Sequence, residues 1–378
     1  MSEAKPIGGR IFTWPFMACL AVVLIAVYFL AQRFIYGLGA VTNMNDGYPW
    51  GIWIAYDVVI GTALACGGYA MALLVYVFNR GEYHPLVRPA MMASMFGYTL
   101  AGVSVFFDIG RYWQGYNIFL PGFANFRSVL LEVALCIGTY VLVLWIEFAP
   151  AILEKLKADR LKARLNRIIF VFIALGVLLP TMHQSSLGTM MLAAGYKLSP
   201  LWQTGFLPLL FLVSALMIGY AVVIFESTIS CVAFRRPLET DLLGRLAGVI
   251  PWILVIYLII RIEDVNLRGY LPLAFSGDLR SNMFLLENTF LGLALLILLY
   301  PANRIKPRLL FLSAVFIMCG AGLYRINTYL VGFDPGNGWQ YFPSVQEITI
   351  TFAIIAAEIM AYIWFVKKLP VLADLKHA

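Results

Sequence analysis

The sequence predicts an all-α polytopic membrane protein with about ten transmembrane helices, and two observations carry this prediction. Of the 378 residues, 62% are apolar and only 12% are charged, whereas soluble domains contain about 25% charged residues. Apolar runs of about 20 residues recur along the chain, which is the length that a helix needs to cross a bilayer. We therefore expect residues 1–378 to form a single integral-membrane domain.

Ten spans are expected, in the order of the apolar runs. The basic N-terminus leads into an apolar run that is too long for a signal peptide, so we expect it to be the first span. Because ten is even, both termini should lie on the same side of the membrane. The expected ranges are 14–35, 51–78, 89–110, 128–150, 168–193, 206–233, 246–262, 282–301, 308–331 and 347–367.

A short internal similarity suggests a repeat. Residues 127–132 read RSVLLE and residues 280–287 read RSNMFLLE, and each stretch opens a span, four spans apart. An even offset keeps the same topology. The pattern predicts two four-helix bundle repeats, 51–193 and 206–331, with the first and last spans peripheral.

The basic residues indicate the orientation. They concentrate in short connections on one side, above all in EKLKADRLKARLNR after the fourth span. Basic loops stay in the cytoplasm, so both termini are expected there. The net charge of +7 follows from this bias and does not indicate nucleic-acid binding. Aromatic, Gly/Pro-rich loops such as RYWQGYNIFLPGFANFR then lie on the outer side, where they suit the membrane interface or a docking surface.

Cysteine and histidine usage speaks against a metal cofactor in this chain. None of the five cysteines forms a C-x-x-C motif, so we expect no iron–sulfur cluster, zinc site or disulfide framework. Of the histidines His84, His183 and His377, only His183 falls in an expected span. A bis-histidine haem needs two facing ligands, so we expect no b-type haem and no bound metal.

Charged residues inside the expected spans fall into two groups by depth. Such residues are costly in hydrocarbon and usually functional. Asp108 and Arg111 are three residues apart and should share a helix face, either at a site or as a structural ion pair. The group toward the outside contains Asp57, Asp108, Arg111, Glu132, His183, Glu287 and Arg325, and the group toward the cytoplasm contains Glu147 and Glu226.

Two glutamates on one expected helix suggest a proton path. Glu132 and Glu147 are 15 residues apart, which corresponds to about 22 Å along a helix and a difference of about 60° around it. They therefore lie on one face, and polar groups or waters would have to bridge them. The alternative for Glu147 is that its side chain reaches the membrane interface next to Pro150.

His183 lies in the segment PTMHQSSLG. Pro180 is expected to interrupt the helix there, and the surrounding polar side chains offer hydrogen bonds. A histidine in such a place can bond a quinone carbonyl and take part in its protonation. The alternative is a hydrogen-bonded core histidine. Buried carboxylates and a repeat would also suit a proton-coupled transporter.

The chain resembles a known family at several of these segments. They are PWGIWIAYDVVIGTALACGGYA, YVFNRGEYHPLVRPA, DIGRYW, IEFAP and PTMHQSSLG, and the similarity extends to QYFPSVQE near the C-terminus. They are similar to the NrfD/PsrC family of quinone-reactive membrane subunits. The combination of NRGEYHPLVRPA with PTMHQSSLG resembles the HybB-type branch, whose members serve periplasm-facing respiratory [NiFe] hydrogenases.

The resemblance implies a function in the bacterial inner membrane. Electrons from H2 oxidation would come from the hydrogenase large and small subunits through a periplasmic ferredoxin-like iron–sulfur subunit and reduce menaquinone. The positions matching the quinone site are Asp57, Asp108, Arg111 and His183, and those matching a proton path from the cytoplasm are Glu132, Glu147 and Glu226. The chain would hold no electron carrier, so only the complex would be an enzyme, in contact with membrane lipid. The alternatives are a subunit of another NrfD-type reductase and the transporter.

Overall fold

The computed structural model describes residues 5–372, and the prediction of an all-α membrane protein is confirmed. No strand occurs among these residues, and ten helices are long and apolar enough to cross a membrane. Each predicted span overlaps one of them. They are Trp14–Tyr36, Trp53–Val77, Gly81–Asp108, Val129–Lys155, Ile169–Ala193, Leu207–Ala233, Thr240–Leu267, Leu279–Leu299, Pro307–Val331 and Val345–Lys368.

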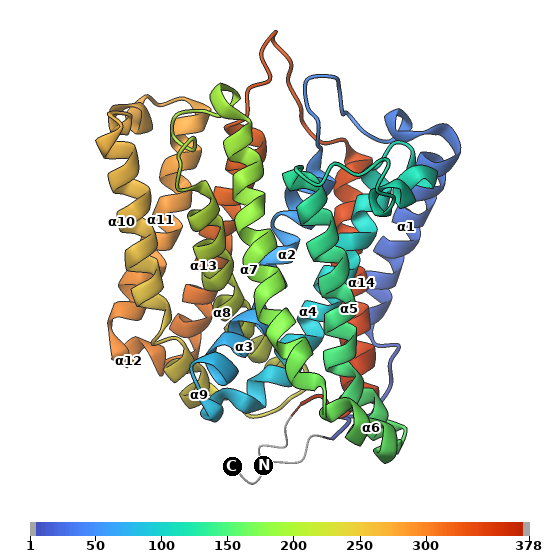
Figure 1. The fold of residues 1–378 in the computed structure, drawn as a ribbon. Coiled ribbons are helices and arrows are strands. Elements are labelled where there is room, and N and C mark those ends of the chain that lie inside the picture. Colours follow the sequence, from blue (N-terminus) through green and yellow to red (C-terminus); the bar gives the residue numbers. More distant parts are fainter. Residues whose placement is uncertain (1–4, 373–378) are drawn as a thin grey trace. The chain divides into compact units, whose positions relative to one another are not determined.

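Six of the spans are single α-helices (Figure 1). They are α1 (Trp14–Tyr36), α5 (Val129–Lys155), α7 (Ile169–Ala193), α8 (Leu207–Ala233), α11 (Leu279–Leu299) and α14 (Val345–Lys368).

The other four spans combine two or more elements. These elements are η2 (Trp53–Val58), α2 (Gly61–Leu64), α3 (Gly67–Ala72) and η3 (Leu73–Val77) in the second span, the short η4 (Gly81–Tyr83) and α4 (His84–Asp108) in the third, α9 (Thr240–Leu246) and α10 (Ile250–Leu267) in the seventh, and α13 (Pro307–Ile326) and η8 (Asn327–Val331) in the ninth. Short helices also form connections: η1 (Leu38–Ala40), η5 (Tyr112–Phe119), α6 (Asp159–Asn166), η6 (Gly195–Lys197), η7 (Leu271–Phe275) and α12 (Pro301–Arg304).

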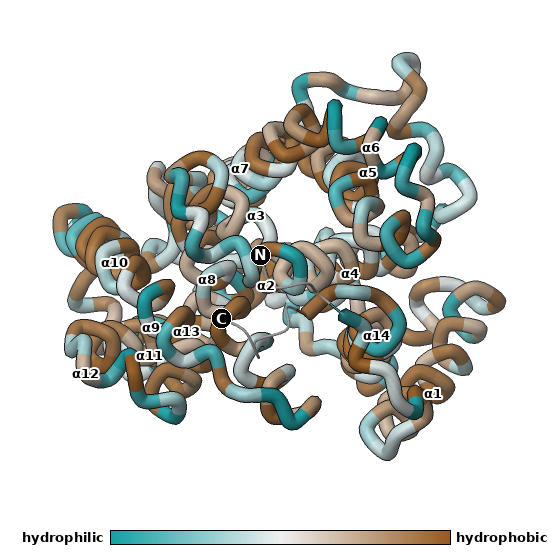
Figure 2. Tube along the Cα trace, turned by 90° about the horizontal axis from the view of Figure 1, so that it is seen from below, coloured by the Kyte–Doolittle hydropathy of each residue, from teal (hydrophilic) through white to brown (hydrophobic). Residues whose placement is uncertain are grey.

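The surface of the spans is apolar. Large hydrophobic side chains such as Leu24, Leu142 and Trp252 are more than half exposed on the helices, and hydrophobic residues run along the helices while hydrophilic ones gather in the connections (Figure 2). In lipid this exposure is favourable, because the surrounding acyl chains are apolar.

Polar residues cap the N-termini of three spanning helices, each of which follows a loop. The Ser128 hydroxyl accepts a hydrogen bond from the Leu131 amide, and Asp278 accepts one from the Ser281 amide at 2.7 Å. At α14, Ser344 and Glu347 form a reciprocal capping box. Each cap satisfies amides that the first turn of a helix leaves without a partner.

Contacts divide the described chain into two compact units. The first contains 5–62, 91–179 and 335–372, and the second contains 63–90 and 180–334. In the first unit α1 packs along α14. In the second, α13 packs against α8 and α11, and α8 also packs against α3 and α10. The predicted four-helix repeats, 51–193 and 206–331, remain a prediction.

Glycines allow close helix packing within the second unit. A Cβ on Gly320 of α13 would lie 2.9 Å from the Glu287 carbonyl oxygen of α11, and one on Gly219 of α8 would lie 2.6 Å from the Cys66 carbonyl oxygen. Both distances are too short for a side chain. Small residues at such points are characteristic of membrane helix interfaces, where backbones approach closely.

Local helix geometry differs from the prediction in two ways. Pro180 does not interrupt α7, which is continuous from Ile169 to Ala193; a proline removes only one amide donor, and a membrane helix tolerates that loss. In contrast, π-helical turns occur at Trp53–Val58, Leu73–Val77 and Asn327–Val331. Such turns are frequent at functional sites, and two of the three carry the polar residues described next.

Candidate functional site

Asp57 is placed by the π-helical turn of η2 in the first unit. Its side chain is 4% exposed, and its Oδ2 accepts a hydrogen bond from the Thr351 hydroxyl of α14 at 3.4 Å. Its Oδ1 has no hydrogen-bond partner among the described residues. A buried carboxyl oxygen in this state is available to a ligand, a water or a proton.

Asp108 is the last residue of α4 and lies within electrostatic range of Asp57 and of Glu347 in α14. Its Oδ1 is also buried and has no partner in the described part of the chain. The structure therefore brings together two of the residues predicted to bind quinone and adds a third carboxyl group.

The cation beside Asp108 is Arg33 of α1, which is 1% exposed. Its guanidinium donates to the Phe107 carbonyl at 2.7 Å and to the Ile109 carbonyl, and it lies 5.2 Å from the Tyr112 ring centroid. A positive charge is favourable at the C-terminus of a helix such as α4. Arg33 thus binds the carbonyl groups at the end of α4 and also provides a positive charge beside Asp108.

Arg111 does not share a helix face with Asp108, contrary to the prediction. Helix α4 ends at Asp108, and Arg111 lies beyond it as the exposed residue before η5. No hydrogen bond or ion pair joins the two side chains within residues 5–372. The helix ends two residues earlier than the expected span, and the backbone turns at Gly110 and Arg111.

Glu347 is held by the loops around it. It is fully buried and accepts hydrogen bonds from the Tyr341 hydroxyl at 2.6 Å, the Ser344 amide at 2.8 Å and the Asn43 amide at 3.0 Å. Burial raises the pKa of Tyr341, and its hydrogen bond to Glu347 raises it further. Glu347 therefore fixes the loops next to the cluster.

Glu132 and Glu147 both lie on α5, as predicted, but in different surroundings. Glu132 is in the first turn and its side chain is exposed. Glu147 is half-buried against α7: a Cβ on Gly176 would lie 2.8 Å from its Oε1. Pro180 has no amide hydrogen, so it leaves the Gly176 carbonyl without the usual helical donor. The Glu147 carboxyl group thus lies beside a weakened turn.

His183 and Glu226 lie in the second unit. The His183 side chain is fully buried, and its Nε2 is 3.0 Å from the Gln184 side-chain nitrogen. One turn further along α7, the Leu187 carbonyl accepts a hydrogen bond from Tyr329. Glu226 is half-buried on α8, four residues before Ser230.

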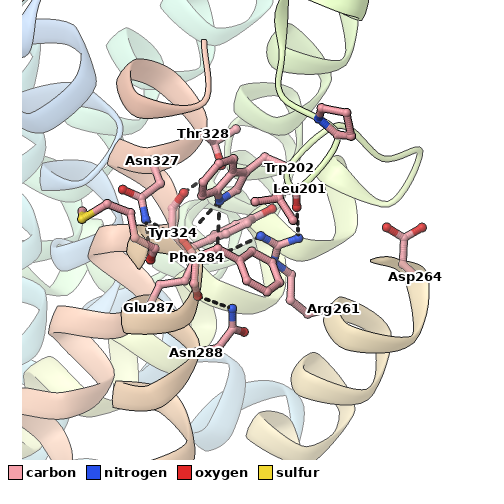
Figure 3. A network of polar contacts seen from close by, with 12 residues as sticks. Leu201, Trp202, Arg261, Asp264, Phe284, Glu287, Asn288, Tyr324, Asn327 and Thr328 are labelled. Carbon is pink, nitrogen blue, oxygen red and sulfur yellow. Dashed lines mark hydrogen bonds and ion pairs between the residues drawn. The ribbon is translucent and has the colours of Figure 1, made fainter. Parts of the chain in front are cut away.

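A buried ion pair in the second unit was not predicted (Figure 3). Arg261 of α10 donates to Glu287 of α11 at 2.8 Å, and both side chains are 1% exposed. Arg261 also donates to the Leu201 carbonyl at 2.6 Å. Glu287 accepts further hydrogen bonds from Trp202 and from Asn327, the first residue of η8, at 2.7 Å. The pair thus connects two helices, a loop and a π-helical turn.

Aromatic rings enclose this ion pair. The Arg261 guanidinium carbon lies 4.6 Å from the ring centroid of Phe284 and 5.2 Å from that of Tyr324. Figure 3 shows the Phe284 and Tyr324 side chains beside Arg261. The hydroxyl groups of Tyr257 and Tyr324 have no partner in the described chain. Because water is excluded, the charges are stabilised by each other and by the ring faces.

Sequence reasoning missed Arg33, Arg261 and Glu347 because it treated them as ends of apolar runs. Arg33 is near the end of the first run, Arg261 follows LVIYLII, and Glu347 precedes the last run. The signal that could have found Arg261 is an arginine inside the expected span 246–262, at the same end of the bundle as Glu287 in the next span.

Comparison with known proteins identifies the type of chain. The family model described as polysulphide reductase, NrfD, matches residues 40–331. The chain is 44% identical to an Escherichia coli K12 protein named probable Ni/Fe-hydrogenase 2 b-type cytochrome subunit, over 99% of this chain and 96% of that protein.

A second relative comes from Nitratidesulfovibrio vulgaris Hildenborough. It is named menaquinone reductase, integral membrane subunit, and is 28% identical over 85% of this chain and 82% of its own length.

The name of the E. coli relative corrects the expectation of a chain without haem. That relative is named a b-type cytochrome subunit, and this name points to haem. The expectation that the chain has no b-type haem is therefore wrong. The described residues do not supply the two facing histidines of a bis-histidine haem, since His183 is buried, His84 is exposed and His377 lies outside the described residues. We assign no residue to a haem.

Proposed function

Because this chain belongs to the NrfD family of membrane subunits, we propose that it is the quinone-binding membrane subunit of a periplasm-facing [NiFe] hydrogenase complex. Electrons from H2 would reach it through a periplasmic ferredoxin-like iron–sulfur subunit fed by the hydrogenase small and large subunits. Menaquinone would accept the electrons, with proton uptake from the cytoplasm.

The observation that carries this proposal is the buried carboxyl cluster of the first unit. Asp57 and Asp108 each keep one oxygen without a partner, and Arg33 provides the one positive charge beside Asp108 among the described residues. Asp57 and Asp108 interact electrostatically and, in the described part of the chain, only Asp108 has a cation beside it, so ionisation of both carboxyl groups would leave uncompensated charge in a low-dielectric site. Such a pair can pass protons to a bound quinone.

The reaction balances with two such proton transfers. Oxidation of H2 releases two electrons and two protons at the partner subunits, and a quinone takes up two electrons and two protons to become a quinol. In this proposal Asp57 and Asp108 of the first unit contact or protonate the quinone, and the family resemblance adds Arg111 and His183 as further candidate positions. Glu132, Glu147 and Glu226 deliver protons from the cytoplasm. If the protons come from that side, turnover builds a proton gradient across the membrane.

The location in this proposal follows from the family and the charges. The chain would lie in the bacterial inner membrane with both termini in the cytoplasm, as the basic connections require. The aromatic connections, including η5, would face the periplasm and receive the iron–sulfur subunit. Trp113, Tyr116 and Phe119 are more than half exposed there.

A second candidate is supported by the relative named as a menaquinone reductase subunit. In that case the same membrane subunit would serve another reductase, and the quinone site would be unchanged. The two candidates differ in the partner and not in the buried residues.

Purification of the tagged chain from native membranes in mild detergent tests the proposal. Mass spectrometry of the co-purified proteins and extraction of bound quinone are the measurements. A [NiFe] hydrogenase pair, a ferredoxin-like subunit and menaquinone are expected. A different set of redox subunits would select the second candidate, and a chain without partners or quinone would contradict both.

The site itself is tested by Asp57→Asn in the purified complex. Hydrogen-dependent quinone reduction should fall about a hundredfold, the usual effect of losing a proton-transfer group, while hydrogen-dependent reduction of a soluble dye stays normal. The matched control is Asp46→Asn, because Asp46 is exposed in a loop of the same unit. Equal quinone reduction in both variants would remove Asp57 from the site.

A further inference from the structure

The connection between α5 and α7 carries a dense group of positive charges. It contains the helix α6 (Asp159–Asn166) and six basic residues within 13 positions: Lys155, Lys157, Arg160, Lys162, Arg164 and Arg167. We call this group the α6 basic surface. Five of its members are exposed, and Lys162 is half-buried.

Within the part of the chain that the structure describes, almost none of this charge is neutralised. Lys162 forms an ion pair with Glu154 at 3.2 Å, which links α6 back to α5. The other five basic side chains make no ion pair with any residue between 5 and 372. The remaining acidic residue, Asp159, lies in the first turn of α6, where the helix dipole already favours a negative charge.

Short tethers hold α6 at the membrane surface. Helix α5 has 27 residues and is about 40 Å long, which exceeds the hydrocarbon core of about 30 Å, so its end reaches the headgroup layer. Three residues connect α5 to α6 and two connect α6 to α7. Such connections reach at most about 14 Å. The α6 basic surface therefore cannot leave the headgroup region.

In the turn that follows α5, a lysine occupies a left-handed backbone position that is usually filled by glycine. Lys157 has φ 54°, and the amides of Lys157 and Ala158 bond the carbonyls of Glu154 and Leu153. This is the helix-ending motif whose left-handed residue is commonly glycine. A lysine there is strained relative to glycine, and its side chain is exposed.

Polar and apolar stripes lie next to each other on α6. Arg160 and Arg164 are four residues apart and share a face. Leu161 and Leu165 form the neighbouring stripe, and Leu161 is 54% exposed. A helix of this kind lies in the interface, with apolar side chains in the acyl boundary and basic ones at the phosphates.

From this geometry we propose that the α6 basic surface binds the phosphate headgroups of anionic phospholipids. Arg160 and Arg164 supply the specific contacts, because planar guanidinium groups donate pairs of hydrogen bonds to phosphate. Leu161 adds an apolar contact with the acyl chains. The inference does not depend on quinone chemistry or on the partner subunits.

The experiment titrates the delipidated, detergent-solubilised chain with phosphatidylglycerol, cardiolipin or phosphatidylcholine and counts bound lipids by native mass spectrometry. Both anionic lipids should bind more tightly than phosphatidylcholine. Arg160→Gln with Arg164→Gln should weaken anionic lipid binding about thirtyfold, from the usual contribution of each basic residue near a lipid surface.

The matched control is Lys306→Gln with Arg308→Gln. These residues are exposed and unpaired within the described chain, and they lie at another helix connection. The control removes the same charge at a connection without the Leu161 stripe and should weaken anionic lipid binding less than the α6 double variant. Equal losses in both double variants, or equal binding of phosphatidylcholine, would overturn the proposal.

Competition separates the possible sources of the phosphate. Inorganic phosphate and an oligonucleotide should displace the lipid poorly, because neither occupies the Leu161 stripe. Displacement by either at the lipid's own affinity would contradict lipid recognition. A variant with Leu161→Ser should lose part of the affinity and keep the preference for anionic headgroups.

Discussion

The buried charge of Arg261 is tolerated only because a partner of opposite charge, Glu287, lies beside it. Arg261 and Glu287 are both 1% exposed and lie 2.8 Å apart. A pair of this kind is weak evidence for stability when compared with apolar residues, but removal of one partner leaves a buried charge uncompensated. The two side chains must therefore be considered as one unit.

Glu287→Gln should lower the stability of the purified subunit by about 3–5 kcal/mol, the usual cost of breaking a buried pair. The measurement is thermal unfolding in detergent, followed by tryptophan fluorescence. The double variant Arg261→Met/Glu287→Leu should recover much of the loss, because no buried charge remains. If Glu287→Gln alone unfolded like the native chain, the pair would not be stabilising as argued.

Two buried tyrosines on neighbouring turns offer a matched comparison. The Tyr329 hydroxyl donates to the Leu187 carbonyl at 2.8 Å, one turn from His183, whereas the Tyr324 hydroxyl has no partner in the described residues. Tyr329→Phe should cost about 1 kcal/mol, and Tyr324→Phe should be neutral or slightly stabilising. Denaturant unfolding of both variants checks this. Equal losses would show that ring packing, and not the hydrogen bond, is responsible.

At the scale of elements, close approach of α5 and α7 controls the surroundings of Glu147. Gly176→Ala would place a methyl group 2.8 Å from the present position of Glu147 Oε1. The carboxyl group has to move, and because it is the far end of a flexible side chain, the substitution should cost little stability while displacing the acidic group. Proton uptake coupled to quinone reduction should slow, as measured in proteoliposomes with a pH-sensitive dye.

Gly138→Ala is the control for that substitution. Gly138 lies on α5, the helix of Glu147, and a Cβ there meets nothing within 4 Å, so the variant should be neutral or gain helix propensity. If Gly176→Ala behaves like Gly138→Ala, Glu147 tolerates displacement and its position in a proton path loses support.

The cap of α11 predicts a dependence on pH. Asp278 lies outside the spans, and the hydrogen bond from the Ser281 amide lowers its pKa. A carboxyl group whose pKa is lower in the folded protein than in the unfolded chain stabilises the fold at pH values above its unfolded-state pKa. This contribution is lost as the pH falls through the folded-state pKa. The melting temperature of Asp278→Ala should therefore lie below that of the native chain at neutral pH.

The gap between the two melting temperatures should narrow as the pH falls below the ordinary range of aspartate. Asp278→Asn keeps an oxygen acceptor without the charge, so its melting temperature should vary less with pH than that of the native chain. A gap that stayed constant down to acidic pH would show that the charge of the cap is unimportant.

The sequence was enough to predict where the spanning helices lie, but it did not predict their irregular turns. Apolar length predicted all ten spans, because crossing the bilayer demands it. The π-helical turn that carries Asp57 and the end of α4 at Asp108 depend on tertiary contacts, and no local pattern reports them. For the same reason Arg33, distant in sequence, could not be recognised as the cation beside Asp108.

At the scale of the whole molecule, an even number of spans predicts that both ends of the chain lie on the same side of the membrane. Reporter enzymes that are active only in the periplasm or only in the cytoplasm, fused in turn to each terminus, should give the same cytoplasmic result. A fusion within η5 should give the opposite result. Opposite results for the two termini would contradict the even number of spans.

The ion pair of α10 and α11 also bears on how the chain enters the membrane during biosynthesis. Arg261 leaves the ribosome 26 residues before Glu287, and an arginine without its partner inside an apolar helix is unfavourable to insert. Helix α10 should therefore remain at the protein-conducting channel until α11 emerges, and the two should pass into lipid together as a neutral hairpin. Two residues that stabilise the finished fold would then also set the order of its assembly.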